Sequence, residues 1–466
     1  MRVVFITMFT ESMGGGLGRV AYEIVEAFAQ KHKVLFIHPG ERTKKTIRGN
    51  LWVMEVESRG KSEIVIPDLN FKNIKFIFRN LGKFSPEVVH VQDPGPLSFL
   101  LQLWAKKNGI PFVYTSHVLP TKTGDFGAKE LSGKVGKLLD SKIVRKYFLN
   151  FFNNCDGVIA LNKRAKKDIL EFGYKGKIFL IPNGRNLKTY QTREKKGLKD
   201  KILVFIGYLT RRKNQRYLVE VMRYLPGDYT LKLVGPYIDE KYFAELENLV
   251  KKYKLENVCF IGKVPHERVP EFLAEARVFV SSSKMEVQSL SIIESLASGT
   301  PVVGLPNETI DEFIDASCGY NFPKRTPPKT FALKVKEICS LSESSYRKLS
   351  DNAKKKTLSL DWSKVVNETR KAYWELIESY KSQKTNFFGV KSKSSSFSDF
   401  KLEEFFPKQA RIFNKNNWQD LDSLEKNKMV DKSELYIFLL IVSTFLIGSF
   451  YSLITNIEGL KSKVKL

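Results

Sequence analysis

The sequence predicts an α/β fold made of two doubly wound domains, and three observations support this prediction. Short runs of apolar and β-branched residues alternate with amphipathic helical stretches along most of the chain. A glycine-rich loop, Gly14 to Gly18, separates the first of these runs from the first helical stretch. The chain has 466 residues, which is enough for two domains of ordinary size plus further segments.

The first predicted strand, Arg2 to Met8, passes directly into this glycine loop and is too short to be a signal-peptide core. Bare backbone before a helix N-terminus allows close approach of a phosphate group. A dinucleotide-binding fingerprint is the alternative interpretation. It is disfavoured because Arg19 stands where a glycine is needed and the next strand, Val34 to His38, does not end in an acidic residue.

Further strands are expected in the first half of the chain, and histidines lie in one of them and just after another. The strands are Leu51 to Val56, Val88 to Val91, Phe112 to Thr115 and Val158 to Leu161. His90 lies inside a strand, where a packed side chain is the more common role. His117 follows the carboxyl end of a strand, where open α/β sheets bind ligands.

The stretch from Pro120 to Phe152 is first glycine-rich and then basic and aromatic. Its cations include Lys134, Lys137 and Arg145, beside apolar residues. Two interpretations stay open: a surface helix for anionic headgroups, or a core-packed helix with a basic outer face.

A polar segment between residues 184 and 200, which includes TREKKGLKDK, predicts a domain boundary. Strands resume after it at Ile202 to Gly207, Tyr229 to Gly235, Val258 to Gly262 and Val278 to Ser283. The second domain therefore repeats the alternation of the first.

The stretch from Val278 to Leu305 carries the strongest prediction of chemistry. It reads as strand, loop, helix from Ser289, left-handed stop at Gly299, and a new strand from Pro301 to Leu305. A loop glutamate before a helix N-terminus, such as Glu286, can bind hydroxyls of a ligand whose phosphates take free amides at Ser289 and Leu290. Glu294, about one and a half turns further on, can reach a diol from the same side. For an arbitrary pair of glutamates, a solvated surface role would be the more common one.

The net charge indicates the kind of binding partner, and the spacing of the cysteines indicates the cellular compartment. The formal net charge of +27 indicates an anionic partner, such as nucleic acid, an acidic membrane or a phosphorylated substrate. The four cysteines are far apart and form no C-x-x-C pair, so neither a disulfide framework nor a zinc site is predicted. This composition suits a reducing cytosol.

The C-terminal part is predicted to be a polar tether followed by a membrane span. Residues Ser382 to Asp431 are rich in lysine and serine and lack periodicity. Leu435 to Ile454 has no charged residue over the roughly 20 residues needed to cross a bilayer. Lysines stand on both sides of it, so their number does not set its orientation.

The spacing from Glu286 to Glu294, followed by Gly299-x-Pro301-Val302, resembles the E-x7-E signature of retaining GT-B glycosyltransferases of the GT4 family. Three other segments resemble this family as well: the Gly15-Gly16 loop, the turn Pro182-Asn183-Gly184, and Gly207 to Lys213. The resemblance extends to about Tyr380. It implies two Rossmann-like domains that face each other across a cleft.

The same resemblance assigns roles to individual residues. Lys213 would bind the donor diphosphate; Tyr208 stands where an arginine is usual, and Arg211 or Arg212 would replace it. Glu286 would orient the sugar, Glu294 the ribose, and His117 would contact the transferred sugar. Donor phosphates would also meet Gly15, Gly16 and the amides of Ser289 and Leu290. Neither a metal nor a cofactor is implied.

The expected domains are 1–188 for the acceptor, 189–362 for the nucleotide sugar, a crossing helix at 363–382, a tether at 383–434 and a transmembrane helix at 435–455. The expected function is retaining transfer of a sugar from a nucleotide sugar to a lipid or lipid-linked acceptor. The catalytic domains would lie at the cytoplasmic face of a membrane rich in anionic lipid, held by a single span.

Three alternatives remain open. The enzyme could glycosylate a soluble or nascent polysaccharide and be merely tethered by its tail. A basic nucleic-acid-binding protein is a second alternative, although no nucleic-acid-binding module is recognisable, so no nucleic acid is expected. A catalytically silent scaffold is the third, and Tyr208 keeps it open.

Overall fold

The computed structural model describes residues 1–10, 15–59, 66–122, 142–191 and 200–387. These residues belong to two compact units, one with residues 1–113 and the chain from Glu375 onward, the other with Tyr114–Trp374. Among the helices described, none combines the length and the apolar composition needed to cross a bilayer. The span expected at 435–455 and nearly all of the expected tether lie outside the described residues, so both stay predictions.

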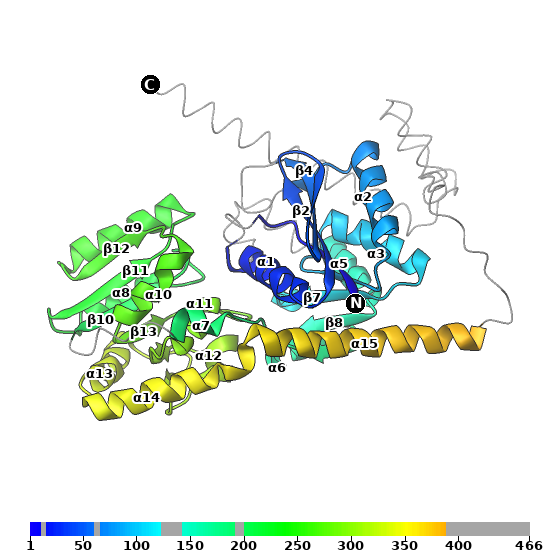
Figure 1. Cartoon of the computed structure of the whole chain (residues 1–466). Coiled ribbons are helices and arrows are strands. Elements are labelled where there is room, and N and C mark those ends of the chain that lie inside the picture. Colours follow the sequence, from blue (N-terminus) through cyan, green and yellow to red (C-terminus); the bar gives the residue numbers. More distant parts are fainter. Residues whose placement is uncertain (11–14, 60–65, 123–141, 192–199, 388–466) are drawn as a thin grey trace, which may run out of the picture. The chain divides into compact units, whose positions relative to one another are not determined.

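The first unit is built on a largely parallel sheet (Figure 1). Its strands lie in the order β3 (Lys44–Arg48), β4 (Leu51–Arg59), β2 (Lys33–Gly40), β1 (Arg2–Ile6), β6 (Val88–Val91) and the start of β7 (Phe112–Ser116), and β5 (Ile66–Pro67) pairs with β4. Its helices are α1 (Gly15–Ala29), α2 (Phe71–Phe84), α3 (Pro96–Asn108) and the end of α15 (Trp362–Phe387).

The central strand β1 shows why this sheet is parallel and covered on both faces. Val3, Val4, Phe5 and Ile6 are all fully buried, as a continuous apolar run in a parallel strand should be. The strand ends at Ile6, earlier than the expected Met8. His90 is buried in β6 with its ring centroid 5.2 Å from that of Phe5, so it is a packed strand histidine.

The second unit contains the rest of β7 with β8 (Gly157–Ala160) and β9 (Lys177–Leu180), which pair in parallel. Around them lie η1 (Pro120–Lys122), α5 (Lys142–Asn153) and α6 (Lys163–Phe172), and α7 (Leu187–Gln191) follows β9 and packs against α11 (Leu290–Ala297). Phe151 and Phe152 of α5 are buried, with ring centroids 5.3 and 5.2 Å from Tyr114. The core-packed interpretation therefore holds for this end of the helix; Lys134 and Lys137 lie outside the described residues.

A six-stranded parallel sheet forms the remainder of the second unit. Its order is β12 (Val258–Gly262), β11 (Tyr229–Val234), β10 (Lys201–Ile206), β13 (Val278–Ser281), β14 (Val302–Gly304) and β15 (Gly319–Asn321). The helices are α8 (Gln215–Met222), α9 (Glu240–Lys252), α10 (Val269–Glu275), α11 (Leu290–Ala297), α12 (Glu308–Phe313), α13 (Pro328–Cys339), α14 (Glu343–Lys356) and the start of α15, with the short 3-10 turns η3 (His266–Arg268) and η4 (Leu358–Leu360).

Helices cover both faces of this sheet and bury two separate apolar clusters (Figure 1). One cluster is completed by α8, α9 and α13, and the other by α7, α10, α11, α12 and α14. This is the doubly wound arrangement that the alternation of strands and helices predicts, and it places ligand sites at the carboxyl ends of the strands.

Candidate functional site

The loop between β13 and α11 is the core of the candidate site. Ser289 is the N-cap residue of α11, with a φ of −73°, and the helix begins at Leu290, one residue after the expected start. Gly299 has a φ of 72°, in the left-handed region that favours glycine, and ends the helix as predicted. The predicted order of strand, loop, helix and strand is therefore confirmed.

Glu286 lies in this loop beside two cations from another loop. Its carboxylate forms an ion pair with Lys213 Nζ, and Arg212 Nη1 lies 3.7 Å from the same oxygen. Burial acts to raise the pKa of Glu286, but the Lys213 and Arg212 cations outweigh it and the pKa is lowered overall. Glu286 is consequently an ionised carboxylate in a buried position.

The turn that follows β10 positions Lys213 and Arg212. Gln215 is fully buried and accepts a hydrogen bond from the Thr210 amide (3.2 Å) while it donates to Tyr208 O (2.9 Å). Arg212 Nη1 donates to Met285 O at 2.9 Å, which ties this turn to the loop of Glu286. Two loops at the ends of adjacent strands thus converge on one carboxylate.

Arg211 points elsewhere. It pairs with Glu245 of α9 at 2.9 Å and lies 3.6 Å from Asp239. Of the two arginines that were expected to replace the one missing at Tyr208, Arg212 is therefore the one beside Glu286.

The backbone of the glutamate loop is held by α12. The Glu286 amide donates to Glu308 Oε2 at 2.9 Å, and the Ser289 amide donates to Thr309 Oγ1 at 2.7 Å. The expectation of a free amide at Ser289 is therefore wrong, because a neighbouring hydroxyl already accepts from it. The first amides of a helix have no partner within the helix, so Leu290 remains the better donor for a ligand phosphate.

Glu294 is almost completely buried, at 2% exposure, and not a surface side chain. Its Oε1 lies 3.4 Å from Arg185 Nε and 3.9 Å from His266 Nε2. Tyr190 OH is 3.0 Å from the same nitrogen of His266. The second glutamate of the pair therefore has its own set of partners, distinct from those of the first.

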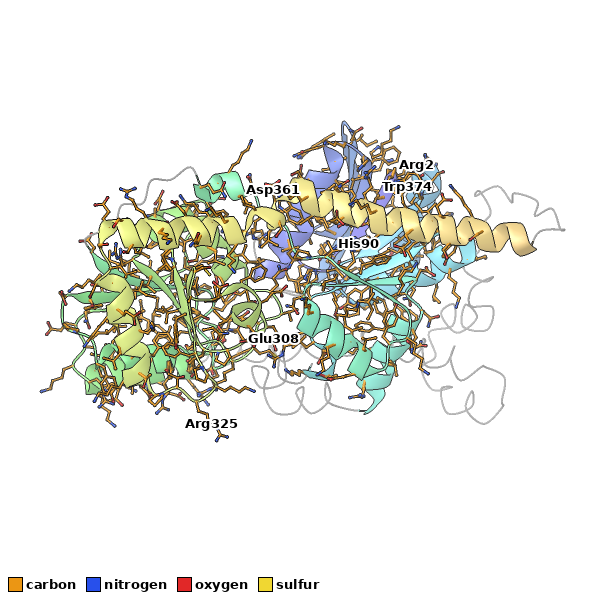
Figure 2. All side chains as sticks on the ribbon, turned by 90° about the horizontal axis from the view of Figure 1, so that it is seen from below. Arg2, His90, Glu308, Arg325, Asp361 and Trp374 are labelled. Carbon is orange, nitrogen blue, oxygen red and sulfur yellow. The ribbon has the colours of Figure 1, made fainter. Side chains whose placement is uncertain are left out.

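The segment from β8 to the turn after β9 contributes further contacts to this loop. The Asn162 side chain donates to Val287 O, and the Asn183 amide donates to Gln288 Oε1 at 2.7 Å. Figure 2 labels Glu308 close to α6, whose Arg164 Nε lies 3.5 Å from the Glu308 carboxylate. Lys122 Nζ lies 3.6 Å from the same oxygen.

These supporting residues were missed by sequence reasoning. Arg185 carries no local signal, because its partner Glu294 lies more than a hundred positions away. Asn162 and Glu308 carry no local signal either. The partner of Asn162 lies more than a hundred positions away in the sequence, and that of Glu308 about twenty.

His117 follows the end of β7 and is half-buried. Burial lowers the pKa of His117 to about 3, so its imidazole is neutral near pH 7. A neutral imidazole offers one donor and one acceptor to a ligand hydroxyl. Gly15 and Gly16 belong to the first unit, at the start of α1, where Gly15 has a φ of 56°.

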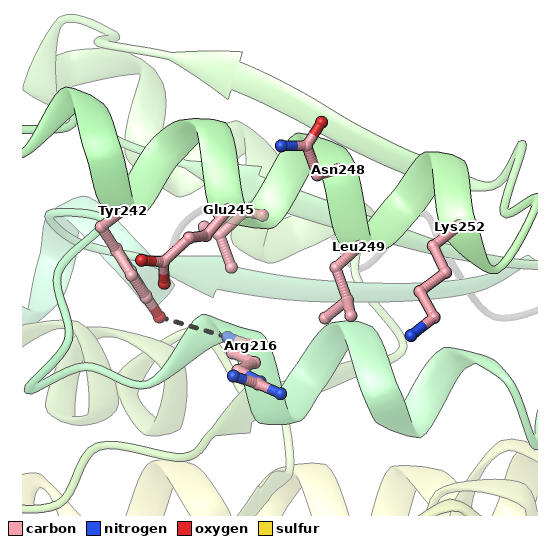
Figure 3. Close-up of a pocket in the computed structure, with 7 residues that line it drawn as sticks. Arg216, Tyr242, Glu245, Asn248, Leu249 and Lys252 are labelled. Atoms are coloured by element: carbon pink, nitrogen blue, oxygen red, sulfur yellow. Dashed lines mark hydrogen bonds between the residues drawn. The ribbon is translucent and has the colours of Figure 1, made fainter.

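A pocket between α8 and α9 contains none of the predicted site residues (Figure 3). It is lined by Arg216, Tyr242, Glu245, Leu246, Asn248, Leu249 and Lys252. Tyr242 OH accepts from the Arg216 amide (3.2 Å) and donates to Gln215 (3.4 Å), so this pocket lies behind the turn that carries Lys213. The described part of the chain also contains no group of three or more His, Cys, Asp or Glu side chains that could hold a metal ion.

Two family models match the chain. Residues 14–189 match Glycosyltransferase Family 4, and residues 188–356 match Glycosyl transferases group 1. The second match contains Lys213 and both glutamates.

The chain is similar to named relatives over different shares of its length. The alpha-monoglucosyldiacylglycerol synthase of Streptococcus pneumoniae is 26% identical over 53% of this chain and 60% of its own length. The GDP-mannose-dependent alpha-(1-6)-phosphatidylinositol dimannoside mannosyltransferase of Mycobacterium tuberculosis is 25% identical over 75% of this chain and 90% of its own length. Among solved structures, Anabaena Alr3699/HepE in complex with UDP and glucose aligns with a TM-score of 0.63 at 15% identity, over 80% of this chain and all of that one. The fold is thus GT-B-like, with two Rossmann-like domains.

Proposed function

Because the chain belongs to the glycosyltransferases of family 4 and group 1, a family of transferase enzymes, we propose that it transfers a sugar from a nucleotide sugar to a lipid or lipid-linked acceptor. We propose further that the anomeric configuration is retained. The observation that carries the proposal is the convergence of Lys213 and Arg212 on the buried carboxylate of Glu286 at the carboxyl ends of β10 and β13.

The two cations suit the charge that develops on a departing nucleoside diphosphate. Lys213 is a compact point charge and Arg212 a planar donor, and both are partly accessible beside Glu286. Cations fixed where charge develops supply one of the largest contributions to catalysis. The amide of Leu290 and the N-terminus of α11 add a favourable field for the same phosphates.

The carboxylates and the histidine suit the sugar and the ribose. In this proposal Glu286 accepts hydrogen bonds from hydroxyls of the transferred sugar, and Glu294 from those of the ribose. His117, neutral at physiological pH, contacts a hydroxyl of the sugar or of the acceptor. Gly15 and Gly16 allow the backbone to approach the donor or the acceptor closely.

The acceptor class rests on the relatives and on charge. The names of the S. pneumoniae and M. tuberculosis relatives describe glycosylation of diacylglycerol and phosphatidylinositol lipids. A net charge of +27 favours an anionic surface at the cytoplasmic face of a membrane. A polysaccharide acceptor, with the chain held only by its C-terminal segment, is the second candidate.

The test is product analysis with the full-length protein. The protein would be incubated with UDP-glucose, UDP-N-acetylglucosamine, UDP-galactose and GDP-mannose, each with diacylglycerol, phosphatidylinositol, a glycolipid or a soluble oligosaccharide. Mass spectrometry should find one lipid product, and NMR should find the anomeric configuration of the donor in it. Transfer only to the oligosaccharide would favour the second candidate, and absence of any product would contradict the proposal.

A further inference from the structure

We propose that Arg185 is a positioning residue that holds Glu294 in the orientation that binds the ribose of the donor. This inference rests on the proposed function, since it concerns the residue assigned there to the ribose. It adds a role for a side chain outside the E-x7-E signature.

The backbone around Arg185 is fixed on both sides. The Arg185 amide donates to Leu360 O at 2.7 Å, and Arg185 forms a parallel bridge with Asp361. A Cβ added to the preceding residue, Gly184, would lie 2.3 Å from the ring of Trp362. The side chain therefore projects from a turn that has no room to shift.

The Arg185 side chain is itself buried and directed at Glu294. It is 1% exposed, its Nη1 donates to Gly184 O at 3.0 Å, and its Nε lies 3.4 Å from Glu294 Oε1. A guanidinium stays protonated at any relevant pH. Arg185 is therefore a permanent counter-charge for a carboxylate that is almost completely removed from water.

Arg185 and His266 both lie beside Glu294. His266 Nε2 is 3.9 Å from Glu294 Oε1 and 3.0 Å from Tyr190 OH, and it carries a charge only when protonated. Arg185 is always charged and lies closer to the same oxygen, at 3.4 Å.

Removal of Arg185 should consequently act through Glu294. A buried carboxylate without its cation is strongly disfavoured, so Glu294 should leave the position in which it accepts hydrogen bonds from the ribose. The donor KM should rise while kcat changes little.

A second buried arginine offers a matched control. Arg277 is 2% exposed in the same unit, where it donates to Leu341 O at 2.9 Å and lies 3.7 Å above the ring of Tyr346. Arg277→Met removes a buried cation of the same size without removing a partner of Glu294. It should lower stability but leave the donor KM as in wild type.

The experiment compares full-length wild type, R185M, R185K, R277M, E294Q and R185M/E294Q in steady-state kinetics with the nucleotide sugar that the enzyme turns over. R185M should raise the donor KM by about tenfold to a hundredfold and leave kcat little changed. R185K keeps the charge and should recover part of the donor affinity. The double variant should have the KM of E294Q alone.

A wild-type KM for R185M, an equal rise in KM for R277M, or effects that multiply in the double variant would overturn the proposal. If R185M fails to fold, the melting temperatures of E294Q and R185M/E294Q decide the matter: loss of both charges should be tolerated, and an unfolded double variant contradicts the pairing. A wild-type KM for E294Q would instead reject the ribose assignment, which belongs to the proposed function.

Discussion

The two glutamates of the E-x7-E pair differ in where their counter-charges come from. Glu286 pairs with Lys213 and Arg212, whose side chains are 13% and 21% exposed and belong to a turn in the same Rossmann-like half. Glu294 pairs with Arg185, which is fully buried and comes from the turn after β9. One carboxylate thus has cations that a ligand can reach, whereas the other has a cation that a ligand cannot reach.

This difference indicates two distinct roles. Cations that a ligand phosphate can share will contribute where charge changes during the reaction. A buried cation beside its carboxylate contributes a constant field and a fixed geometry, and these favour binding of the donor. The comparison predicts that changes around Glu286 affect the rate of chemistry, and that changes around Glu294 affect donor affinity.

The largest effect is expected for Glu286→Gln. This substitution preserves shape but removes the negative charge that is proposed to face the transferred sugar, so kcat should fall on the order of a thousandfold. Steady-state kinetics with the identified donor measure it. Glu245→Gln is the control, because Glu245 lies on α9 and pairs with the exposed Arg211. This variant should retain wild-type kcat. A kcat within a few-fold of wild type for Glu286→Gln would contradict the distinction.

An effect smaller than that of Glu286→Gln is expected for Arg212→Ala, and Arg211→Ala is its control. Arg212 lies 3.7 Å from Glu286, whereas Arg211 pairs with Glu245 in an exposed position. Loss of Arg212 should lower kcat/KM about tenfold, and loss of Arg211 less than about twofold, because exposed ion pairs contribute little. Equal effects of the two substitutions would mean that Arg212 does not replace the arginine missing at Tyr208.

The smallest effect concerns stability rather than activity. The folded-state pKa of His117 is lowered to about 3 from the ordinary 6.5. As pH falls from 6.5 towards 3, the unfolded chain binds a proton at His117 that the folded chain does not, so the free energy of unfolding decreases. His117→Asn should flatten this part of the pH dependence. Urea unfolding between pH 7.5 and pH 4 measures the slope, and an unchanged slope would show that His117 is not buried in its neutral form.

The strands and helices that form the backbone of the site could be predicted from the sequence. The edge strand β3 and the side chains that hold the site in place could not. Buried parallel strands such as β13 leave continuous apolar runs, and the helix after it begins one residue from the predicted position. β3 was missed because its residues, KKTIR, are mostly exposed and carry no apolar run. Such an edge strand forms because it pairs with β4, and spacing alone does not reveal that partner.

The same limit applies to side-chain partners. The cations near Glu286 could be predicted because the segment around Lys213 resembles a known family. Asn162 and Glu308 contact the glutamate loop, and Arg185 contacts Glu294 in α11, through the folding of distant segments, so their roles became visible only in three dimensions. The bond from the Ser289 amide to Thr309 was hidden for the same reason.

Calorimetric titration of the donor nucleotide sugar into full-length wild type, Lys213→Ala, Glu294→Ala and Arg211→Ala tests the central assignment most directly. The account predicts at least about tenfold weaker binding for Lys213→Ala and Glu294→Ala, because each loses a charged contact, and wild-type binding for Arg211→Ala. Wild-type dissociation constants for both Lys213→Ala and Glu294→Ala would contradict the account.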